Sequence, residues 1–389
     1  MGALAIDLYL PALPGLSREL HAGEPVVQLT LTAFLVGIGS GQLLAGSLSD
    51  SLGRRRPLLV GLAVYVVASG LCAVSGSAAV LVTSRLLQGF GAAAAVVIAR
   101  AIVRDVYAGA RAARMFSLLM LVIGVSPILA PLVGGQLLRV TSWHGMFWAL
   151  AGLGLLVLVA AAVGLPETLP DARRKAGGLL ESIRTFGRLL ADRRFSGYVV
   201  TFGSAFAATF AYLSASPFVF QGIYHVSPQM YGVLFGINGV GLIAASQINA
   251  AAVGRIALGR LLALGLGVRV LGAFALVGVV LIGGLGLVGI MVPLVLVVAS
   301  NGLVAPNTTA LALSRHPEAA GAASAVLGVV QFGVGALVAP LVGLGGAQSA
   351  LPMTIVLAGG AAVGVLSLLL IVGSRPAWLG QRWGLRRID

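Results

Sequence analysis

Long apolar runs recur along the whole chain and are separated by short polar segments. A helix that crosses a membrane needs ~20 apolar residues, whereas strands of a membrane barrel alternate polar and apolar positions over ~10 residues. The runs here are continuous and therefore predict helices. They cover residues 1–17, 26–46, 58–76, 79–103, 114–138, 143–165, 196–220, 229–251, 263–283, 286–311, 320–343 and 350–373. The pattern predicts an all-α polytopic membrane protein with twelve transmembrane helices.

The longest polar segment, 166–194, lies between the sixth and seventh runs. It divides the chain into two halves of equal span number. We expect an N-terminal six-helix bundle at 1–165, a central loop at 166–194, a C-terminal six-helix bundle at 195–373 and a tail at 374–389.

A short internal repeat and a helical pattern in the central loop add to this division. The sequence APLVG at 130–134 recurs at 339–343. Because the two copies lie about half the chain apart, they favour two related halves. Within the central loop, residues 179–190 have helical spacing and predict a helix along the membrane surface.

The first run is short and contains Asp7, Pro11 and Pro14. At a rise of ~1.5 Å per residue, residues 1–17 form a helix of ~25 Å, less than the ~30 Å hydrocarbon core of a membrane. We therefore expect the natural chain to begin further upstream.

Composition excludes a soluble protein and several kinds of site. The 389 residues are 59% hydrophobic and 9% charged, against about 25% charged residues in soluble domains. One cysteine, Cys72, and four scattered histidines provide neither a disulfide nor metal-ligand spacing. The sequence has no Walker-type G-x-x-x-x-G-K-[ST], which argues against ATP as the energy source. We therefore expect no cofactor and no metal.

The net charge of +14 comes from basic residues spread over short loops rather than from one patch. We interpret it as a topology signal, with affinity for anionic lipid and none for nucleic acid. Positive charge resists translocation, so the basic loops should be cytoplasmic. With both termini cytoplasmic, the outer segments hold only Arg18 and Arg139. The inner loops and tail hold arginines 54–56, 104, 111, 114, 255, 260, 315, 375, 382, 386 and 387, with those of the central loop.

We select two ionisable side chains as lying at membrane depth, Asp7 in the first predicted span and Arg85 in the fourth. A charge at the membrane centre costs ~2.5–3.5 kcal/mol on insertion scales, so such residues usually have a role. Arginine stays protonated and needs a partner, for which the Asp7 carboxylate is the natural candidate. Relative movement of the two would change the proton affinity of the carboxylate. The alternative is a static structural pair.

Several motifs resemble those of the major facilitator superfamily. The motif G-x-L-x-D-x-x-G-R-R-x-x-L at 46–58 resembles the loop between its second and third spans. RLLQGFGAA at 85–93 is similar to its span-four motif, and 127–135 to the proton-antiporter motif ending G-P-x-x-G-G, with Ala130 in place of a glycine. DLYLPALP at 7–14 looks like the start of the bicyclomycin-resistance (Bcr/CflA) drug-efflux subfamily. The resemblance covers essentially the whole chain and implies two pseudo-symmetric six-helix bundles.

The resemblance also implies roles for particular residues. The alternative to a latch is a set of solvated loop charges, and the alternative to a hinge or seal is ordinary helix packing. A conformational latch at the inner ends of helices would comprise Gly46, Asp50, Gly53, Arg54 and Asp105. Proline removes backbone donors and glycine lets helices approach closely. A hinge or seal in the fifth span would comprise Pro127, Pro131, Gly134 and Gly135. For the substrate cavity we select polar residues at membrane depth: Tyr9, Gln88, Asn238, Asn301 and Gln331.

The resemblance implies a secondary-active multidrug exporter that exchanges protons for small amphiphilic drugs across the bacterial inner membrane by alternating access. If Asp7 and Arg85 are the only intramembrane charges, the cavity should favour neutral or weakly charged compounds. The first alternative is a proton-coupled or facilitative transporter of an endogenous metabolite. A membrane-embedded enzyme is disfavoured because no reactive cluster is present, and a channel because the charges form no ring. We expect a monomer whose partners are the transported small molecule, protons and membrane lipid.

Overall fold

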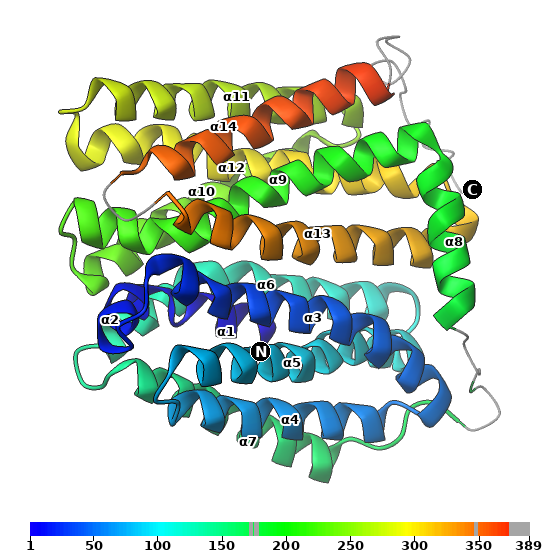
Figure 1. Ribbon diagram of the computed structural model, residues 1–389. Helices are drawn as coiled ribbons and strands as arrows, with labels where there is room; N and C mark the ends of the chain where they lie inside the picture. The colour runs from blue at the N-terminus through cyan, green and yellow to red at the C-terminus, as the bar shows by residue number, and fades with distance from the viewer. Residues whose placement is uncertain (171–173, 175–178, 346–348, 373–389) are drawn as a thin grey trace. The chain divides into compact units, whose positions relative to one another are not determined.

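The computed structural model describes the chain apart from residues 171–173, 175–178, 346–348 and 373–389. The described residues are mainly helical and contain no strand beyond one isolated bridge between Val253 and Ile256. The helices, in the order shown in Figure 1, are α1 Gly2–Asp7, η1 Leu10–Ala12, α2 Leu13–Glu19, α3 Glu24–Leu52, α4 Arg55–Ala73, α5 Ala78–Val106, α6 Gly109–Leu137, α7 Trp143–Gly164, α8 Leu179–Ala191, α9 Arg193–Pro217, η3 Phe218–Ile223, α10 Pro228–Ala252, α11 Leu258–Ile282, α12 Gly286–Leu313, η4 Pro317–Ala319, α13 Ala320–Gly343, α14 Leu351–Leu366 and η5 Ser367–Val372. The expected all-α class is confirmed.

Ten of the described helical segments are long and apolar enough to cross a membrane. They correspond to ten of the predicted runs, so the protein is a multi-pass membrane protein. α6 is not among the ten, and the part of it that counts as an apolar helix among the described residues is Gly124–Leu137. The count of twelve spans stays a prediction.

The first predicted span, 1–17, is not one continuous helix. It is broken into α1, the short η1 and α2. Pro11 and Pro14 each stand at the first or second position of a new helical segment. Proline lacks a backbone N–H and clashes with the preceding turn, so it starts a helix more readily than it continues one. The break places Asp7 at the end of α1.

α8 confirms the helix predicted at 179–190. Phe186 and Leu189 on this helix pack against a core of the second packing unit, which includes Phe195 of α9 and Leu311 of α12. The apolar face of α8 is therefore used for packing. Its position along a membrane surface stays a prediction.

Packing divides the chain into two compact units. The first comprises Met1–Ser182, Leu213–Gly236 and Gly335–Ala350, and the second comprises Ile183–Tyr212, Ile237–Val334 and Leu351–Asp389. Each of α9, α10 and α13 therefore contributes one end to the first unit and the remainder to the second. These units are defined by packing, and the sequence-based bundles with their boundaries at 165, 194 and 373 stay a prediction.

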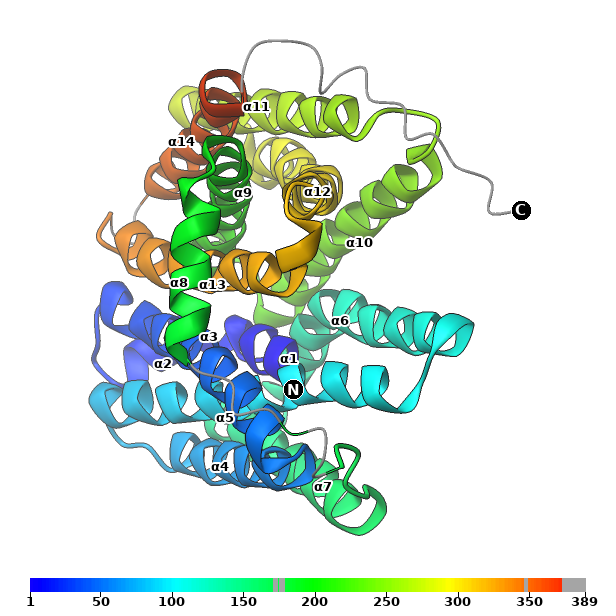
Figure 2. The ribbon, with the colours of Figure 1, turned by 90° about the vertical axis from the view of Figure 1, so that its right-hand side faces the viewer.

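In the first unit, glycines allow neighbouring helices to approach closely. α3 and α5 lie side by side, and α4 packs against α5 and α7 (Figure 2). A Cβ on Gly89 of α5 would overlap the backbone oxygen of Phe34 in α3, and a Cβ on Gly91 would overlap that of Gly61 in α4. α5 is thereby held between two neighbours, and this fixes the position of Arg85, one turn before Gly89.

Candidate transport site

Arg85 is fully buried in α5 and lies among aromatic rings of the first unit. Its guanidinium carbon is 4.4 Å from the centroid of the Tyr9 ring, 4.2 Å from that of Phe34 and 5.6 Å from that of Phe147. An aromatic face attracts a cation by about 0.5–2 kcal/mol, more when both are desolvated. These three rings, the aromatic cage, stabilise the buried positive charge without a carboxylate.

Hydrogen bonds orient the guanidinium inside the aromatic cage. Arg85 Nη1 donates to Gln88 Oε1 at 2.6 Å and to the backbone oxygen of Ala5 at 3.1 Å. Gln88 Nε2 in turn donates to Ser69 Oγ at 2.8 Å, which connects α5 to α4. Nε and Nη2 of Arg85 have no acceptor among the described residues. Gln88 therefore orients the Arg85 guanidinium, and contact of Gln88 with substrate stays a prediction.

Asp7 ends α1 and is buried, with 4% of its surface exposed. Among the described residues, the Asp7 carboxylate forms no hydrogen bond or ion pair. The expected contact with Arg85 does not form between the described side chains, and both oxygen acceptors of the guanidinium, on Gln88 and Ala5, bind Nη1. Arg85 instead reaches the backbone of Ala5, two residues before Asp7. The proton-coupling roles of Asp7 and Arg85 stay predictions.

The turn that follows Asp7 packs directly against α6. A Cβ on Gly134 would overlap the backbone oxygen of Leu8, so only glycine permits this approach. The neighbouring Gly135 accepts a hydrogen bond from Gln229 Nε2 of α10 through its backbone oxygen, at 2.9 Å. Gly134 and Gly135 are therefore close-approach positions, and their role as a hinge or seal stays a prediction.

α6 remains helical through both of its prolines, Pro127 and Pro131. A Cβ on Gly232 of α10 would lie 2.6 Å from the backbone oxygen of Pro131, so the two helices are in backbone contact there. Proline frees the carbonyl one turn earlier but does not end this helix.

Four polar side chains of the first unit donate to backbone oxygens far away in the sequence. All four are amides or hydroxyls without charge. The bonds are Gln28 Nε2 to Ser214 at 3.3 Å, Thr32 Oγ1 to Ala336 at 3.1 Å, Gln221 Nε2 to Pro11 at 3.0 Å, and Gln229 Nε2 to Gly135 at 2.9 Å. They join α3, η3 and α10 to segments far away in the sequence. The pattern of apolar residues does not predict these contacts.

Arg54 brings together the charged residues of the predicted latch. Its Nη1 donates to Asp50 Oδ1 at 2.6 Å and to Ser49 Oγ at 2.8 Å, and its Nε donates to Asp105 Oδ2 at 2.8 Å. Arg54 is 3% exposed, whereas the side chain of Asp105 is 14% and that of Asp50 is 49% exposed. Gly53 has φ of +89°, a conformation that favours glycine. The structure thus joins the ends of α3 and α5, and the latch function stays a prediction.

Glu167, which the sequence analysis did not select, completes this cluster. Its Oε1 accepts the backbone N–H of Arg54 at 2.8 Å and of Leu169 at 2.9 Å, and Oε2 accepts that of Arg55 at 3.1 Å. Burial acts to raise the pKa of the Glu167 carboxyl, but these N–H donors outweigh it and hold the pKa below its usual range. The carboxylate therefore caps the start of α4 as an anion.

Glu167→Gln should make the thermal stability of the protein less dependent on pH. Because the folded pKa of Glu167 is lowered, its stabilisation is fully present above the unfolded value of about 4.3 and is lost as the pH falls through the folded pKa. We expect wild type to melt at a higher temperature than the variant at pH 7 and the difference to vanish in strong acid. Thermal unfolding in detergent from pH 7 to pH 3 measures this.

Glu318→Gln is the matched control, since Glu318 is an exposed carboxylate of η4 whose described side-chain contact is His316 at 3.3 Å. Its melting temperature should differ little from that of wild type across the range. A gap between wild type and Glu167→Gln that widens toward acid would contradict the assignment.

Arg269 of α11 is a third buried intramembrane charge, so the expectation of only two is wrong. It is 1% exposed. Its Nε donates to Ser300 Oγ and its Nη2 to Asn301 Oδ1, both at 3.0 Å. Asn301 Nδ2 in turn donates to Thr209 Oγ1 at 2.8 Å. The sequence could have indicated this residue, because Arg269 is a charged residue inside the predicted span 263–283, just as Arg85 is inside the predicted span 79–103.

The predicted cavity residues fall into two groups. Tyr9 and Gln88 meet around Arg85 in the first unit, where Tyr9 also shares a hydrogen bond of 3.1 Å with Thr30. Asn238, Asn301 and Gln331 belong to the second unit. Of these, Asn238 is buried, Asn301 bonds to Arg269, and Gln331 is half-buried. Contact of these residues with a transported molecule stays a prediction.

Comparison with solved structures shows that the fold is that of membrane transporters. The nucleoside transporter NupG superposes with a TM-score of 0.74 at 12% sequence identity, covering 94% of this chain and 96% of that one. The sequence matches the Major Facilitator Superfamily over residues 1–340, and the chain belongs to this family.

Two relatives resemble the chain along most of their length. An uncharacterized MFS-type transporter, YdgK, of Bacillus subtilis (strain 168) is 39% identical over 369 residues, 94% of this chain and 91% of that protein. A bicyclomycin resistance protein homolog of Haemophilus influenzae (strain ATCC 51907 / DSM 11121 / KW20 / Rd) is 30% identical over 362 residues, 93% of this chain and 91% of that protein. The resemblance to drug-resistance members of the family, expected from the sequence motifs, is confirmed.

Proposed function

We propose that the protein is a secondary-active exporter that exchanges protons for small amphiphilic drugs by alternating access. Its setting is the bacterial inner membrane, with both termini in the cytoplasm. The observation that carries the proposal is the buried Asp7 carboxylate in the same packing unit as the caged Arg85. A carboxylate in this surrounding is desolvated, so it is suited to take up and release a proton.

The environment of Asp7 supports a proton carrier rather than a structural ion pair. Arg85 is stabilised by the rings of the aromatic cage and by neutral acceptors, so its charge does not depend on Asp7. Asp7 can therefore change its protonation state without removing the partner of a buried arginine. Leu8, the next residue, rests on Gly134 of α6, so movement of α6 can be transmitted to the carboxylate.

The cluster around Arg54 supports a latch that stabilises one conformation. It joins the ends of α3 and α5 through partly buried ionic hydrogen bonds, in which the buried partner is Arg54. Breaking and remaking them would accompany each transport cycle. We further propose that the transporter works as a monomer.

The relatives direct the choice of substrate class. Resistance to bicyclomycin, named for the Haemophilus influenzae homolog, makes this antibiotic the first compound to test. A metabolite transporter remains the alternative, and the following experiment separates the two functions.

The test uses purified protein in proteoliposomes that contain a pH-sensitive dye and are loaded acid inside. We expect bicyclomycin, or another neutral or cationic antibiotic of a panel, to trigger alkalinisation of the lumen. Liposomes without protein measure passive leak. Uptake of the drug without any proton movement would overturn antiport, and proton movement triggered only by metabolites such as amino acids or sugars would overturn drug export.

A further inference from the structure

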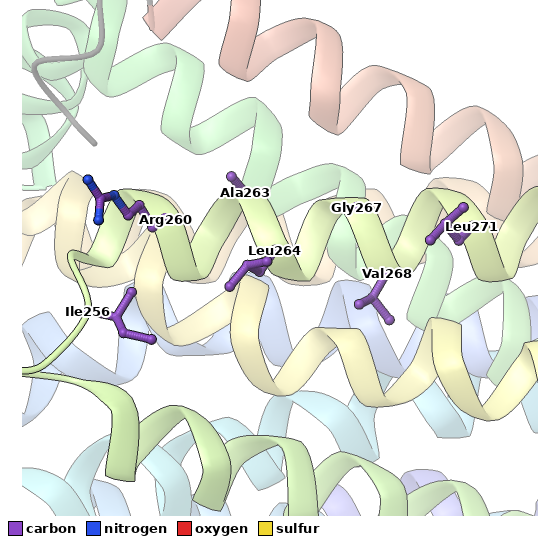
Figure 3. Close-up of a pocket in the computed structure, with 7 residues that line it drawn as sticks. All are labelled: Ile256, Arg260, Ala263, Leu264, Gly267, Val268 and Leu271. Carbon is purple, nitrogen blue, oxygen red and sulfur yellow. The ribbon is translucent and has the colours of Figure 1, made fainter. Parts of the chain in front are cut away.

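α11 carries an open apolar groove on the face turned away from its buried residues. The groove has a volume of about 680 Å³ and runs along the helix past Ala263, Leu264, Gly267, Val268 and Leu271. Figure 3 shows Arg260 at one end of this row and Leu271 at the other. The buried residues of the same helix, among them Leu262 and Leu266, face the core of the second unit instead.

Small residues create the depth of the groove. A Cβ on Gly267 would meet no atom within 4 Å, so the space beside this residue is open. Ala263 lies one turn earlier on the same side. Leu264 and Leu271 border this space and are 56% and 72% exposed. The groove is thus an apolar depression on the outer side of a membrane-spanning helix. In a membrane, this side of the helix faces lipid.

A positive charge without a counterion closes one end of the groove. Arg260 is exposed, and its side chain has no hydrogen bond or ion pair with a described residue. The second unit has two described acidic residues, Asp192 and Glu318. Asp192 Oδ2 is bound by Arg315 at 2.7 Å, and Glu318 contacts His316 at 3.3 Å. Neither compensates Arg260.

We propose that this groove binds one anionic phospholipid, with its phosphate on Arg260 and an acyl chain along α11. Basic pockets at the cytoplasmic ends of transmembrane helices attract acidic headgroups, and this end of α11 is cytoplasmic in the orientation proposed above, on which the inference rests. The exposed Arg255, whose Nη1 donates to the backbone oxygen of Ala251 at 2.8 Å, adds a second positive charge in the preceding loop. A zwitterionic lipid also brings a cation, which is repelled here.

The test measures lipid retention by native mass spectrometry of the full-length protein purified in detergent. Dioleoyl-phosphatidylglycerol and dioleoyl-phosphatidylcholine are added at equal concentrations, and the fraction of protein that keeps one lipid under collisional activation is compared. We expect selective retention of phosphatidylglycerol. Arg260→Gln should lower it about fivefold, the effect of one basic residue near an acidic membrane surface. Gly267→Leu fills the open space in which the acyl chain would lie. It should therefore lower retention of phosphatidylglycerol without disturbing the fold.

Arg104→Gln is the matched control, because it removes an exposed arginine from the end of α5 in the first unit. Size-exclusion profiles of all variants confirm that each is folded. Equal retention of the two lipids would overturn the proposal, and so would an equal loss in Arg104→Gln and Arg260→Gln. A predominant mass of two protein chains that disappears in Gly267→Leu would assign the groove to a second copy instead.

Discussion

Asp7→Asn should abolish drug-triggered alkalinisation of acid-loaded proteoliposomes. Asparagine has nearly the same shape as aspartate but cannot carry a proton, and Asp7 is the buried carboxylate of the first unit. Groups that transfer protons typically contribute about 10²–10⁴-fold to the rate of the step they serve. We therefore expect the proton signal to fall to the level of empty liposomes, measured with the same dye and drug concentrations as for wild type.

Two further measurements make this prediction specific to the proton. Asp7→Glu keeps a titratable group and should retain part of the signal, although its longer side chain enters a packed site. The thermal unfolding temperature of Asp7→Asn should be equal to or above that of wild type, because a buried unpaired carboxylate is lost. Undiminished alkalinisation in Asp7→Asn would show that Asp7 is not the proton carrier.

Gly134→Ala should impair both stability and transport. The added methyl group would overlap the backbone oxygen of Leu8, which cannot rotate away as a side chain could. Overpacking of this kind costs about 1–3 kcal/mol, and the strain falls on the turn that follows Asp7. We expect a melting temperature several degrees lower and a drug/proton exchange rate at least about tenfold lower, corresponding to about 1.4 kcal/mol.

Gly124→Ala in the same helix is the control for this change. A Cβ on Gly124 meets no atom within 4 Å, and alanine favours the helix over glycine. This variant should be as stable as wild type or more stable and should transport normally. If Gly124→Ala and Gly134→Ala behave alike, the close approach of Leu8 to α6 is not what limits the cycle.

The parts of the site that depend on short sequence spacing could be predicted. Arg85 and Gln88 are separated by one turn of α5 and form the contact that this spacing favours. Asp50 and Arg54 are only four residues apart in the sequence, on either side of the chain reversal at Gly53, and they also meet. The long apolar runs likewise correspond to the observed helices because hydropathy over about 20 residues is a strong signal. α8 follows from its helical spacing in the same way.

Contacts that depend on tertiary packing could not be predicted. The aromatic cage draws Tyr9, Phe34 and Phe147 from three segments, and nothing in their spacing connects them to Arg85. Glu167 binds backbone N–H groups, which every residue but proline possesses, so no pattern of side chains indicates it. Arg269 differs, because the criterion that selected Arg85 applies to it equally.

The four side chains that donate to distant backbone oxygens have a consequence for how the protein tolerates sequence change. At each contact only the donor is chemically specified, since any residue supplies the same carbonyl. Substitutions at Ser214, Ala336 or Pro11 that preserve the backbone should leave the bond intact. Replacement of Gln28, Thr32 or Gln221 removes it. Because the acceptor is a backbone carbonyl, a change of the acceptor residue requires no matching change of the donor. A comparison of aligned sequences would therefore show invariant donors but would not identify the residues whose carbonyls they bind.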